Sequence, residues 1–531
     1  MRLKKIIALC LTALFLCLAP GCASNVEEDL QVPKQVSDYE VGGETPKKGG
    51  TLRLALAGAG SLNPILAENE HTMQVLNLVY DSLFCRDANE ALVPVLCSQY
   101  SVSADGLTYE FTIRDGIGFH NGDTLSAQDV EATIYMILSS ESLYKSKLSA
   151  ISTCSSSGNT LYITLHNPVV NFPALLDFPV LSDEDISVYD SLTYVPNGTG
   201  RYKVQSYKKS KELYLSVNEN YFRNFSPYIE NIAVYLLKDA GAAVTMLENM
   251  QIDVLSSHVI NLHAYTPKRN LSSVEHTSGR FTFVGINNQK QALLSAKTRQ
   301  VLSMALDRRE ILSGSTVPYG TAAEIPVPDQ SFWNSGTTSM EKPDIQRVKT
   351  MLSEDGWTDS DANGVPEKEV YGEQVMLAPG ILVNSENPTR LKIAEQVKTF
   401  WNAAGIPAYV AVVPYEEYQS RIASGEYDVF IGSVSLSENY DVSFLLKTNA
   451  NPLGVSSEVI DRTLNTLAIS NQEAYKQAQF YELCNALRSE MPLVGLFFEN
   501  DVIVFDSRVK GNIKPSGSDM FYSIDQWFLS E

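Results

Sequence analysis

Residues 109–113 alternate between hydrophobic and polar side chains, which is the pattern of a half-buried β-strand. Two tight turns follow at Asp115-Gly116 and Asn121-Gly122, where glycine allows a positive φ at little steric cost. Ser126 predicts the N-cap of a helix, because Asp129 stands three residues later and completes the capping pattern. Apolar residues at helical spacing continue from there: Val130, Ile134, Ile137 and Leu138. The pattern therefore predicts a strand, two turns and a capped helix.

The same two periodicities predict elements along the rest of the chain. Strands are expected at residues 51–57, 161–165, 213–217 and 406–413. Helices are expected at residues 72–84 and 299–306, and a longer one begins at Asn387-Pro388 and ends before Gly405. A helix followed directly by a strand is typical of crossover units, so this last part of the chain favours a mostly parallel sheet.

Residues 1–21 predict a signal peptide, because basic residues precede an apolar run at 6–19 that is too short to span a bilayer comfortably. Cys22 follows Ala-Pro-Gly, which resembles a lipobox, so we expect Cys22 to be lipidated. Residues 22–48 are polar and acidic and predict a tether that does not fold. We therefore expect the body of the protein to lie outside the cytoplasm, at the cell surface or in the periplasm, anchored to the membrane by acyl chains.

Size and charge limit the classes of protein that fit. The 531 residues exceed what one compact core holds, so two or more domains are expected. The formal net charge is −21 and basic clusters are absent, which argues against a nucleic-acid partner because phosphate contacts need such clusters.

The cysteines beyond residue 22 lack CxxC spacing, so neither a zinc knuckle nor a redox motif is predicted for Cys85, Cys97, Cys154 and Cys484. Export permits a disulfide between Cys85 and Cys97. The alternative is that these cysteines are buried free thiols.

No catalytic or metal-binding arrangement emerges from the sequence. The GxSxG, Walker A, GxGxxG and HExxH motifs are absent, and His258 and His263 do not share a helical face. Residues 359–364 resemble the first half of a calcium loop, but Val370 stands where a bidentate glutamate is required. We therefore predict no catalytic residue, no metal and no cofactor.

Several segments together resemble one family, the family 5 extracytoplasmic solute-binding proteins, which are the peptide, dipeptide and nickel receptors of ABC importers. Residues 114–116, 119–122 and 126–130 are similar to its Arg-x-Gly turn, its Phe-His-Asp/Asn-Gly turn and its Thr/Ser-Ala-x-Asp-Val helix start. Residues 196–202 resemble its Pro-x-Gly-Thr-Gly-Pro-Tyr crossover between lobes, with Arg201 in place of the proline.

A further similar segment, residues 299–311, contains Arg299, Asp307 and Arg308. We expect these three residues to form a capped, salt-linked helix pair rather than to bind a ligand.

The resemblance, from about residue 49 to 510, implies an α/β fold with two lobes of the type II (cluster C) periplasmic-binding-protein class. An extra subdomain is expected on the first lobe, and the lobes are expected to close on a ligand by a hinge motion. Lobe I would comprise residues 49–86, 196–285 and 497–531, with residues 497–499 and 502–505 returning to it. Residues 87–195 would form the extra subdomain and residues 286–496 lobe II.

The resemblance also implies a function. A monomeric receptor would capture a solute outside the membrane and deliver it to an ABC permease, with no chemistry of its own. A short peptide is the leading ligand, and an oligosaccharide or a metal chelate is the alternative. An exported enzyme or an adhesive lipoprotein is the competing class, but the sequence offers no catalytic motif in support of an enzyme.

Positions that match the family's ligand contacts are Asn69, Glu70, His71, Thr72, Tyr144, Ser433, Val434, Ser435, Ser437, Glu438 and Asn439. Peptide receptors of the family carry, at the position of Ser437, an aspartate that pairs with the α-amino group of the peptide. A buried ammonium without a charged partner is costly. Either Glu438 substitutes, the ligand is held elsewhere, or the ligand has no free N-terminus; Ser437 could also be no more than a strand-end residue.

Overall fold

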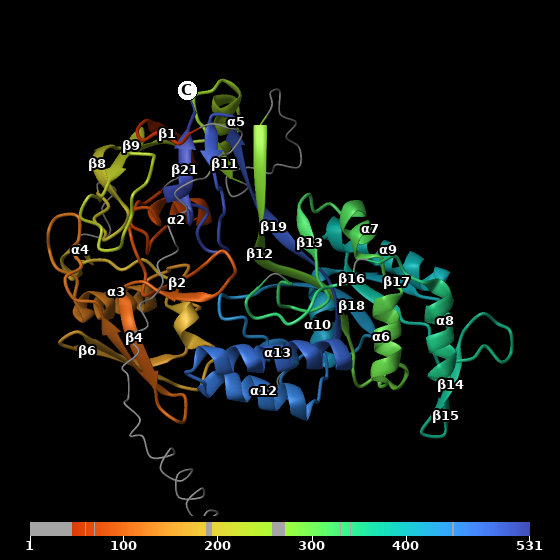
Figure 1. Ribbon diagram of the computed structural model, residues 1–531. Helices are drawn as coiled ribbons and strands as arrows, with labels where there is room; N and C mark the ends of the chain where they lie inside the picture. Colours follow the sequence, from red (N-terminus) through yellow and green to blue (C-terminus); the bar gives the residue numbers. More distant parts are fainter. Residues whose placement is uncertain are drawn as a thin grey trace, which may run out of the picture. The chain divides into compact units, whose positions relative to one another are not determined.

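Two long strands, β12 (Leu271–Ile286) and β19 (Leu493–Asp506), lie in the middle of the largest sheet (Figure 1). The computed structural model describes residues 45–58, 60–67, 69–186, 194–256, 271–329, 331–339, 341–448 and 451–530. The predictions for residues 1–21, for Cys22, for most of the tether and for His258 and His263 lie outside these residues. In the part of the chain that is described, no helix has both the length and the hydrophobicity needed to cross a bilayer.

The largest sheet has 11 strands among the described residues, in the order β17-β16-β18-β12-β19-β11-β1-β10-β9-β8, with β13 pairing with β19 off this path. The other strands of this sheet are β1 (Thr51–Ala57), β8 (Tyr202–Lys208), β9 (Glu212–Val217), β10 (Asn231–Leu237), β11 (Val254–Ser256), β13 (Gly320–Ala322), β16 (Gly380–Asn384), β17 (Tyr409–Val413) and β18 (Val429–Ser435). Within residues 380–435, β16 pairs in parallel with both β17 and β18, as predicted for this part of the chain.

The strands β12 and β19 join the two halves of this sheet. Residues 271–277 of β12 pair with residues 500–506 of β19, whereas residues 281–285 pair with residues 493–498 of β19. Residues 280–286 also pair with β18. The register shifts between Thr277 and Phe281, opposite Glu499, which is followed on β19 by the polar residues Asn500 and Asp501. A register shift locally disrupts the ladder and bends the strand.

Residues 97–165 form a separate antiparallel sheet with the order β4-β5-β7-β6. Its strands are β4 (Cys97–Val102), β5 (Thr108–Ile113), β6 (Ile151–Ser157) and β7 (Thr160–Leu165). The predicted capped helix is α3 (Ala127–Ser139), and the Asp129 carboxylate accepts hydrogen bonds from the Ser126 N–H and hydroxyl at 2.8 Å each. Both glycines of the predicted turns have positive φ, 73° at Gly116 and 98° at Gly122. The local sequence prediction is confirmed here.

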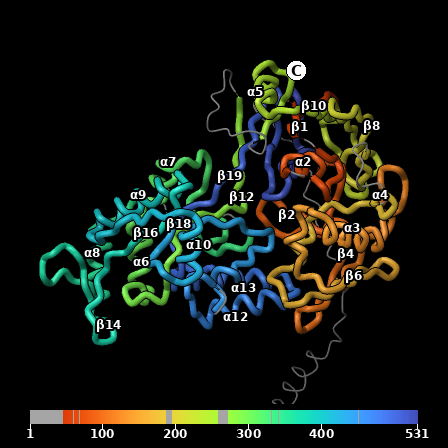
Figure 2. Tube along the Cα trace, turned by 180° about the vertical axis from the view of Figure 1, so that it is seen from behind, coloured from red at the N-terminus to blue at the C-terminus, as the bar shows by residue number. Residues whose placement is uncertain are grey.

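The remaining elements are helices and short strands, traced from red to blue in Figure 2. The helices are α2 (Glu70–Leu76), α4 (Asp183–Ile186), α5 (Ala240–Glu248), α6 (Ala296–Met304), α7 (Arg308–Gly314), α8 (Ile345–Glu354), α9 (Pro388–Ala403), α10 (Tyr415–Ser424), α11 (Ser443–Leu446), α12 (Glu458–Ile469) and α13 (Glu473–Glu490). The 3-10 helices are η1 (Phe172–Leu175), η3 (Gln291–Leu293) and η4 (Ile524–Gln526). The short strands are β2 (Phe84–Arg86), β3 (Leu92–Pro94), β14 (Glu367–Val370), β15 (Glu373–Met376), β20 (Val509–Gly511) and β21 (Trp527–Leu529).

Two predicted elements have other bounds in the structure. The helix expected at 72–84 is α2, which ends at Leu76, because the carbonyls of Leu78 and Val79 accept hydrogen bonds from Tyr202 (2.8 Å) and Gly200 (2.9 Å) of the crossover segment. The strand expected at 406–413 begins at Tyr409, since the Ile406 N–H still bonds to Trp401 at the end of α9. Both boundaries are decided by hydrogen bonds between backbone groups, and the local sequence pattern carries no information about these partners.

Four cysteines of the described residues are free thiols, namely Cys85, Cys97, Cys154 and Cys484. The disulfide between Cys85 and Cys97 is not formed, so the alternative of buried thiols describes this structure. Burial raises the pKa of both thiols to about 12, which keeps them protonated and unreactive at neutral pH.

Buried apolar side chains form one core that runs through the first half of the large sheet and the sheet of residues 97–165. Leu52 and Leu54 of β1, Phe111 of β5 and Trp527 near the C-terminus all belong to it. The second half of the large sheet has its own cores, one on each face. Helices α6, α7 and α9 contribute to one of these, and α10, α12 and α13 to the other.

Candidate ligand site

The first group of predicted ligand residues lies at the N-terminus of α2. Asn69 is the N-cap, and its Oδ1 accepts from the Thr72 N–H at 2.8 Å and from the Thr72 hydroxyl at 2.9 Å. Glu70 is exposed in the first helical turn, where a carboxylate complements the helix dipole. Asn69 and Thr72 therefore have a structural role whether or not they also contact a ligand.

His71 is buried in the same lobe. Its Nε2 lies 2.7 Å from the carbonyl oxygen of Ala55 on β1, and its Nδ1 lies 3.3 Å from the hydroxyl of Ser256 on β11. These contacts fix the start of α2 against two strands. His71 and Thr72 are thus both buried, whereas Asn69 is half-buried and Glu70 is exposed.

The second group lies where β18 ends. Ser433 and Ser435 are exposed, Val434 is half-buried, and Thr282 of β12 shares a hydrogen bond of 3.1 Å with the Ser433 hydroxyl. The pairing of β18 with β16 ends at Phe430, whereas the pairing with β12 continues to Ser435. One edge of β18 beyond Phe430 is therefore not covered by β16.

Beyond β18 the chain stays close to β12. The Leu436 N–H donates to the Gly279 carbonyl at 2.9 Å, and a Cβ at Gly279 would lie 2.5 Å from the Leu436 oxygen. Ser437 then opens a turn, since its carbonyl accepts from the Tyr440 N–H at 3.0 Å. The half-buried Ser437 is thus positioned by the turn.

Glu438 has a partner from the chain itself. Its carboxylate lies 2.7 Å from Nζ of Lys147, which also contacts Asp177 at 3.0 Å, and all three side chains are mostly buried. The Lys147 ammonium lies 5.4 Å from the ring centroid of the buried Tyr144, another predicted ligand residue. Tyr144 and Glu438 therefore meet through Lys147.

The charges of this triad, Lys147, Asp177 and Glu438, act on one another. Burial disfavours the charge of Lys147, but the pull of the two carboxylates outweighs it and raises the Lys147 pKa. Burial would raise the pKa of Glu438, but Lys147 and Arg86 hold that pKa below its ordinary value. Burial and the neighbouring Glu438 raise the pKa of Asp177, against the pull of Lys147. Glu438 is therefore ionised at neutral pH and pairs with Lys147.

Asn439 is also buried. Its Nδ2 donates to the carbonyl of Val170 at 2.8 Å. The predicted residues 438 and 439 therefore both contact residues between 87 and 195.

Sequence reasoning did not single out Arg280, which lies at the register shift of β12. Its guanidinium donates to Glu499 and to Asp501 of β19 at 2.8 Å each, and its side chain is 41% exposed. Burial opposes its charge, but Asp501 and Glu499 raise the Arg280 pKa. Lys147 and Asp177 were missed as well. These contacts depend on chain segments far apart in sequence, so no local motif could have indicated them.

The three residues predicted to form a capped, salt-linked helix pair have structural partners. The Asp307 side chain caps α7 by accepting from the Glu310 N–H at 3.0 Å. Arg299 donates to main-chain carbonyls at the end of α13, including Glu490 at 2.6 Å. Arg308 donates to the Gly495 carbonyl at 2.8 Å, and its nearest carboxylate, Glu324, is 4.0 Å away. The cap was predicted correctly, but carbonyls replace most of the expected salt links.

The loop at residues 359–367 brings Asp359, Asp361 and Glu367 together, with one oxygen of each within 4.8 Å of the others. Glu367 stands at the ninth position of the loop and already accepts from the Ser360 N–H at 2.8 Å. We assign no metal to this loop.

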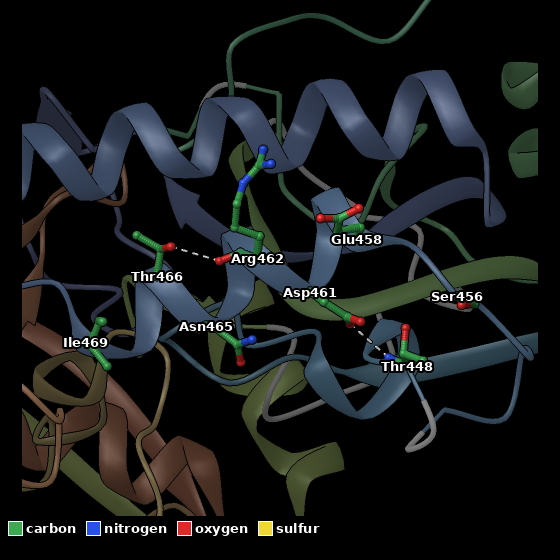
Figure 3. Close-up of a pocket in the computed structure, with 8 residues that line it drawn as sticks. All are labelled: Thr448, Ser456, Glu458, Asp461, Arg462, Asn465, Thr466 and Ile469. Atoms are coloured by element: carbon green, nitrogen blue, oxygen red, sulfur yellow. Dashed lines mark hydrogen bonds between the residues drawn. The ribbon is translucent and has the colours of Figure 1, made fainter.

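A surface pocket of about 570 Å³ lies along α12 (Figure 3). Its lining residues are Thr448, Ser456, Glu458, Asp461, Arg462, Asn465, Thr466 and Ile469. None of the predicted ligand residues lines it, and Arg462 is paired with Glu482 of α13. The pocket is therefore separate from the candidate ligand site.

Two sheet halves joined by a strand pair with a polar middle, next to an uncovered strand end, are the architecture of a two-lobe binding protein. The chain belongs to the bacterial extracellular solute-binding proteins, family 5, whose middle-region model matches residues 91–454. The predicted fold class, two α/β lobes of the periplasmic-binding-protein kind, is confirmed, and so is the predicted class of solute-binding receptor.

Individual relatives are similar over nearly the whole chain. The oligopeptide-binding protein AppA of Bacillus subtilis is 23% identical over 514 residues, which cover 92% of this chain and 93% of the relative. The unliganded open form of the murein tripeptide-binding protein MppA superposes with a TM-score of 0.75 at 17% identity, covering 91% of this chain and 98% of that one. A nickel ABC transporter structure from Bacillus halodurans gives a TM-score of 0.72 at 18% identity, covering 89% and 98%.

Proposed function

We propose that this protein is the substrate-binding component of an ABC importer and that it captures short peptides outside the membrane. The observation that carries the proposal is the similarity to the oligopeptide-binding protein AppA over 92% of the chain. The ligand would lie between lobe I (49–86, 196–285 and 497–531) and lobe II (286–496), and the lobes would close by bending β12 and β19 at their register shift. Residues 87–195 would accompany lobe I as its extra subdomain.

The end of β18 supports a peptide as the ligand. Residues beyond Phe430 present an edge that β16 does not pair with, next to the exposed hydroxyls of Ser433 and Ser435. An extended peptide can add its backbone to such an edge, which gives affinity with little dependence on sequence. The contacts we propose are Asn69, Glu70, His71, Thr72, Tyr144, Ser433, Val434, Ser435, Ser437, Glu438 and Asn439.

One observation favours the alternative, a non-peptide solute such as an oligosaccharide or a metal chelate. Glu438 is paired with Lys147 at 2.7 Å, so it is not a free carboxylate awaiting an ammonium group. A neutral solute would bind next to this pair without a charge left unpaired. The same receptor role would then serve a different ligand.

Around this core function we propose a lipid anchor at Cys22, a monomeric receptor and an ABC permease as its partner. The acyl chains would hold the protein to the membrane while the tether at 22–48 lets it reach the permease. The formal net charge of −21 is consistent with a soluble receptor body and not with nucleic-acid binding.

Isothermal titration calorimetry with three probes tests the proposed ligand class: a synthetic pentapeptide pool, a nickel–histidine chelate and a maltooligosaccharide. The proposal expects saturable heat with the peptide pool alone. Binding of the chelate or the sugar, with no heat from peptides, would reject it in favour of the alternative.

A further inference from the structure

The subdomain and lobe I share one apolar core. Leu52 of β1 and Phe111 of β5 belong to the same buried cluster, together with Trp527 near the C-terminus. Protein cores are packed as densely as organic crystals, so a body built around one core does not divide during a hinge motion. Lobe I and the subdomain therefore form a single mechanical unit.

The body formed by lobe I and the subdomain meets lobe II in two ways. Val170 of the subdomain packs into an apolar core of lobe II, and polar contacts form three further clusters. In the first cluster Arg86 pairs with Glu90, and its Nη1 donates to the Tyr440 hydroxyl at 3.0 Å. The Trp333 indole donates to the Glu90 carbonyl at 3.0 Å. Arg86 and Tyr440 are almost completely buried, so this cluster is closed to water.

The second cluster is the triad of Lys147, Asp177 and Glu438. Lys147 and Asp177 belong to the subdomain, whereas Glu438 follows β18 in lobe II. The ammonium lies 2.7 Å from Glu438 and 3.0 Å from Asp177, so one cation holds a carboxylate of each body.

The third cluster surrounds Lys476 of α13, whose side chain is fully buried. Its Nζ lies 2.9 Å from the Tyr100 hydroxyl and 3.1 Å from Oδ1 of Asn171, both in the subdomain. The carboxylate of Glu473, one turn earlier on α13, is 3.4 Å away. A lysine of lobe II is thus satisfied largely by subdomain groups.

Polar contacts favour a single relative orientation of the two bodies that they join. Hydrogen bonds and ion pairs have a defined geometry, and removing one partner of a buried pair leaves the other unsatisfied. Interfaces between domains that move are also more polar than cores. Three such clusters together favour one orientation of lobe II relative to lobe I.

We propose that Arg86, Lys147 and Lys476 are positioning residues for ligand capture. They form an interlobe clasp, which holds lobe II in one orientation relative to lobe I across the candidate ligand site. The clasp consists of these three residues with Glu90, Tyr440, Asp177, Glu438, Tyr100 and Asn171. Its role in capture rests on the proposed function. The apparent affinity for a ligand scales with the fraction of the protein that is in the binding-competent arrangement of the lobes. Opening the clasp lowers this fraction and weakens binding by the same factor.

The distance between the lobes tests the clasp without any ligand. Spin labels are attached to cysteines at two exposed positions, Lys209→Cys in the turn between β8 and β9 and Tyr371→Cys in the turn between β14 and β15. Cys85→Ser removes the half-buried thiol, and Cys97, Cys154 and Cys484 are buried. Pulsed electron resonance then gives the distribution of distances between the labels.

Lys147→Met removes the central cation of the triad, and Lys147→Arg keeps it. Lys145→Met is the matched control, because Lys145 is an exposed neighbour paired at 3.4 Å with the exposed Glu141 of the same subdomain. We expect a single narrow distribution for the protein, for Lys145→Met and for Lys147→Arg, and a broadened or doubled distribution for Lys147→Met. An unchanged distribution in Lys147→Met would overturn the proposal, even if its thermal stability fell.

Glu438→Gln is the second variant, in case Lys147→Met does not fold. It keeps the shape of the side chain and one acceptor oxygen for Lys147, and it removes the charge that crosses the interface. The same broadening is expected, and an unchanged distribution contradicts the clasp.

Ligand release provides the second readout. With the pentapeptide pool as probe, Lys147→Met should dissociate about tenfold faster or more, since less of the protein is in the competent arrangement, and Lys147→Arg should restore the rate. A normal dissociation rate in Lys147→Met would remove the clasp from ligand capture. If no variant binds the pool, the proposed peptide function fails, while the distance measurement still decides whether the clasp exists.

Discussion

At the scale of single residues, the pair of Glu438 and Lys147 bears most directly on the choice of ligand. The Lys147 ammonium stands 2.7 Å from the carboxylate that was the nearest replacement for an amine-binding aspartate. A ligand ammonium at this point would compete with a cation that the chain supplies and holds in place with Asp177.

Blocking the N-terminus of a peptide should therefore have little effect on binding. We expect an N-acetylated pentapeptide pool to bind within about threefold of the free pool, or ~0.7 kcal/mol, as measured by calorimetry. Amidating the C-terminus instead is the control for loss of a terminal charge. A loss of about tenfold or more on acetylation would show that the amino group finds a carboxylate in the site.

Gly200 offers a test of the crossover segment at the same scale. A Cβ at this position would lie 2.4 Å from the carbonyl carbon of Val79, so Gly200→Ala should force the crossover away from the end of α2. Overpacking of this kind costs about 1–3 kcal/mol, which chemical denaturation measures. Gly118→Ala, whose Cβ would meet the Asp123 oxygen at 3.7 Å, is the control and should change stability much less. Equal stability of the two variants would contradict the close approach.

At the scale of elements, local signals predicted the elements whose determinants are local. The capping pattern of Ser126 and Asp129 gave the start of α3, and Asn387-Pro388 with Gly405 gave both ends of α9. The clasp could not be predicted in this way. Lys147 and Glu438 are almost three hundred positions apart in the chain, and nothing near either residue indicates its partner.

The ends of α2 and β17 illustrate the same limit. The sequence after Leu76 continues to favour a helix, but the crossover segment takes the carbonyls of Leu78 and Val79. The residues of the candidate site likewise fall into those that a local motif indicates and those that only tertiary contacts bring together. Its strand-end serines were found from a family motif, whereas Arg280, Lys147 and Asp177 come together only through tertiary pairing.

The clasp between the subdomain and lobe II should tighten when the pH falls. Burial and Glu438 raise the pKa of Asp177 to about 6 despite Lys147, whereas a solvated aspartate has a pKa of about 3.9. The clasped form therefore takes up a proton that an opened form does not, and lowering the pH from about 7 to about 5 stabilises it. Four other titratable groups face Asp177. The pKa of Glu438 is lowered, and the pKa values of Tyr144, Lys147 and Arg86 are raised. None of these shifts makes its group titrate between about pH 5 and pH 7.

Spin-label distances at the two pH values check this expectation. The distribution should narrow at the lower pH, and Asp177→Asn should abolish the change because it carries no titrating proton. Broadening at the lower pH would mean that loss of the ion pair with Lys147 outweighs the proton uptake.

At the scale of the whole molecule, family membership explains the two-lobe architecture, and the N-terminal segment bears on where the protein acts. Lipidation at Cys22 predicts that the protein fractionates with membranes, and that Cys22→Ala releases it into the soluble fraction. Cys17→Ala, inside the predicted signal peptide, is the control and should leave the distribution unchanged. Membrane association that survives Cys22→Ala would exclude acylation at Cys22 as the anchor.

The central claim is that this receptor captures short peptides, and mass spectrometry of the small molecules released by denaturing the purified protein tests it most directly. We expect a mixture of short peptides, including species with blocked N-termini, since Glu438 is held by Lys147. Release of a sugar or a metal chelate in stoichiometric amount, without peptides, would contradict the peptide function and identify the alternative ligand.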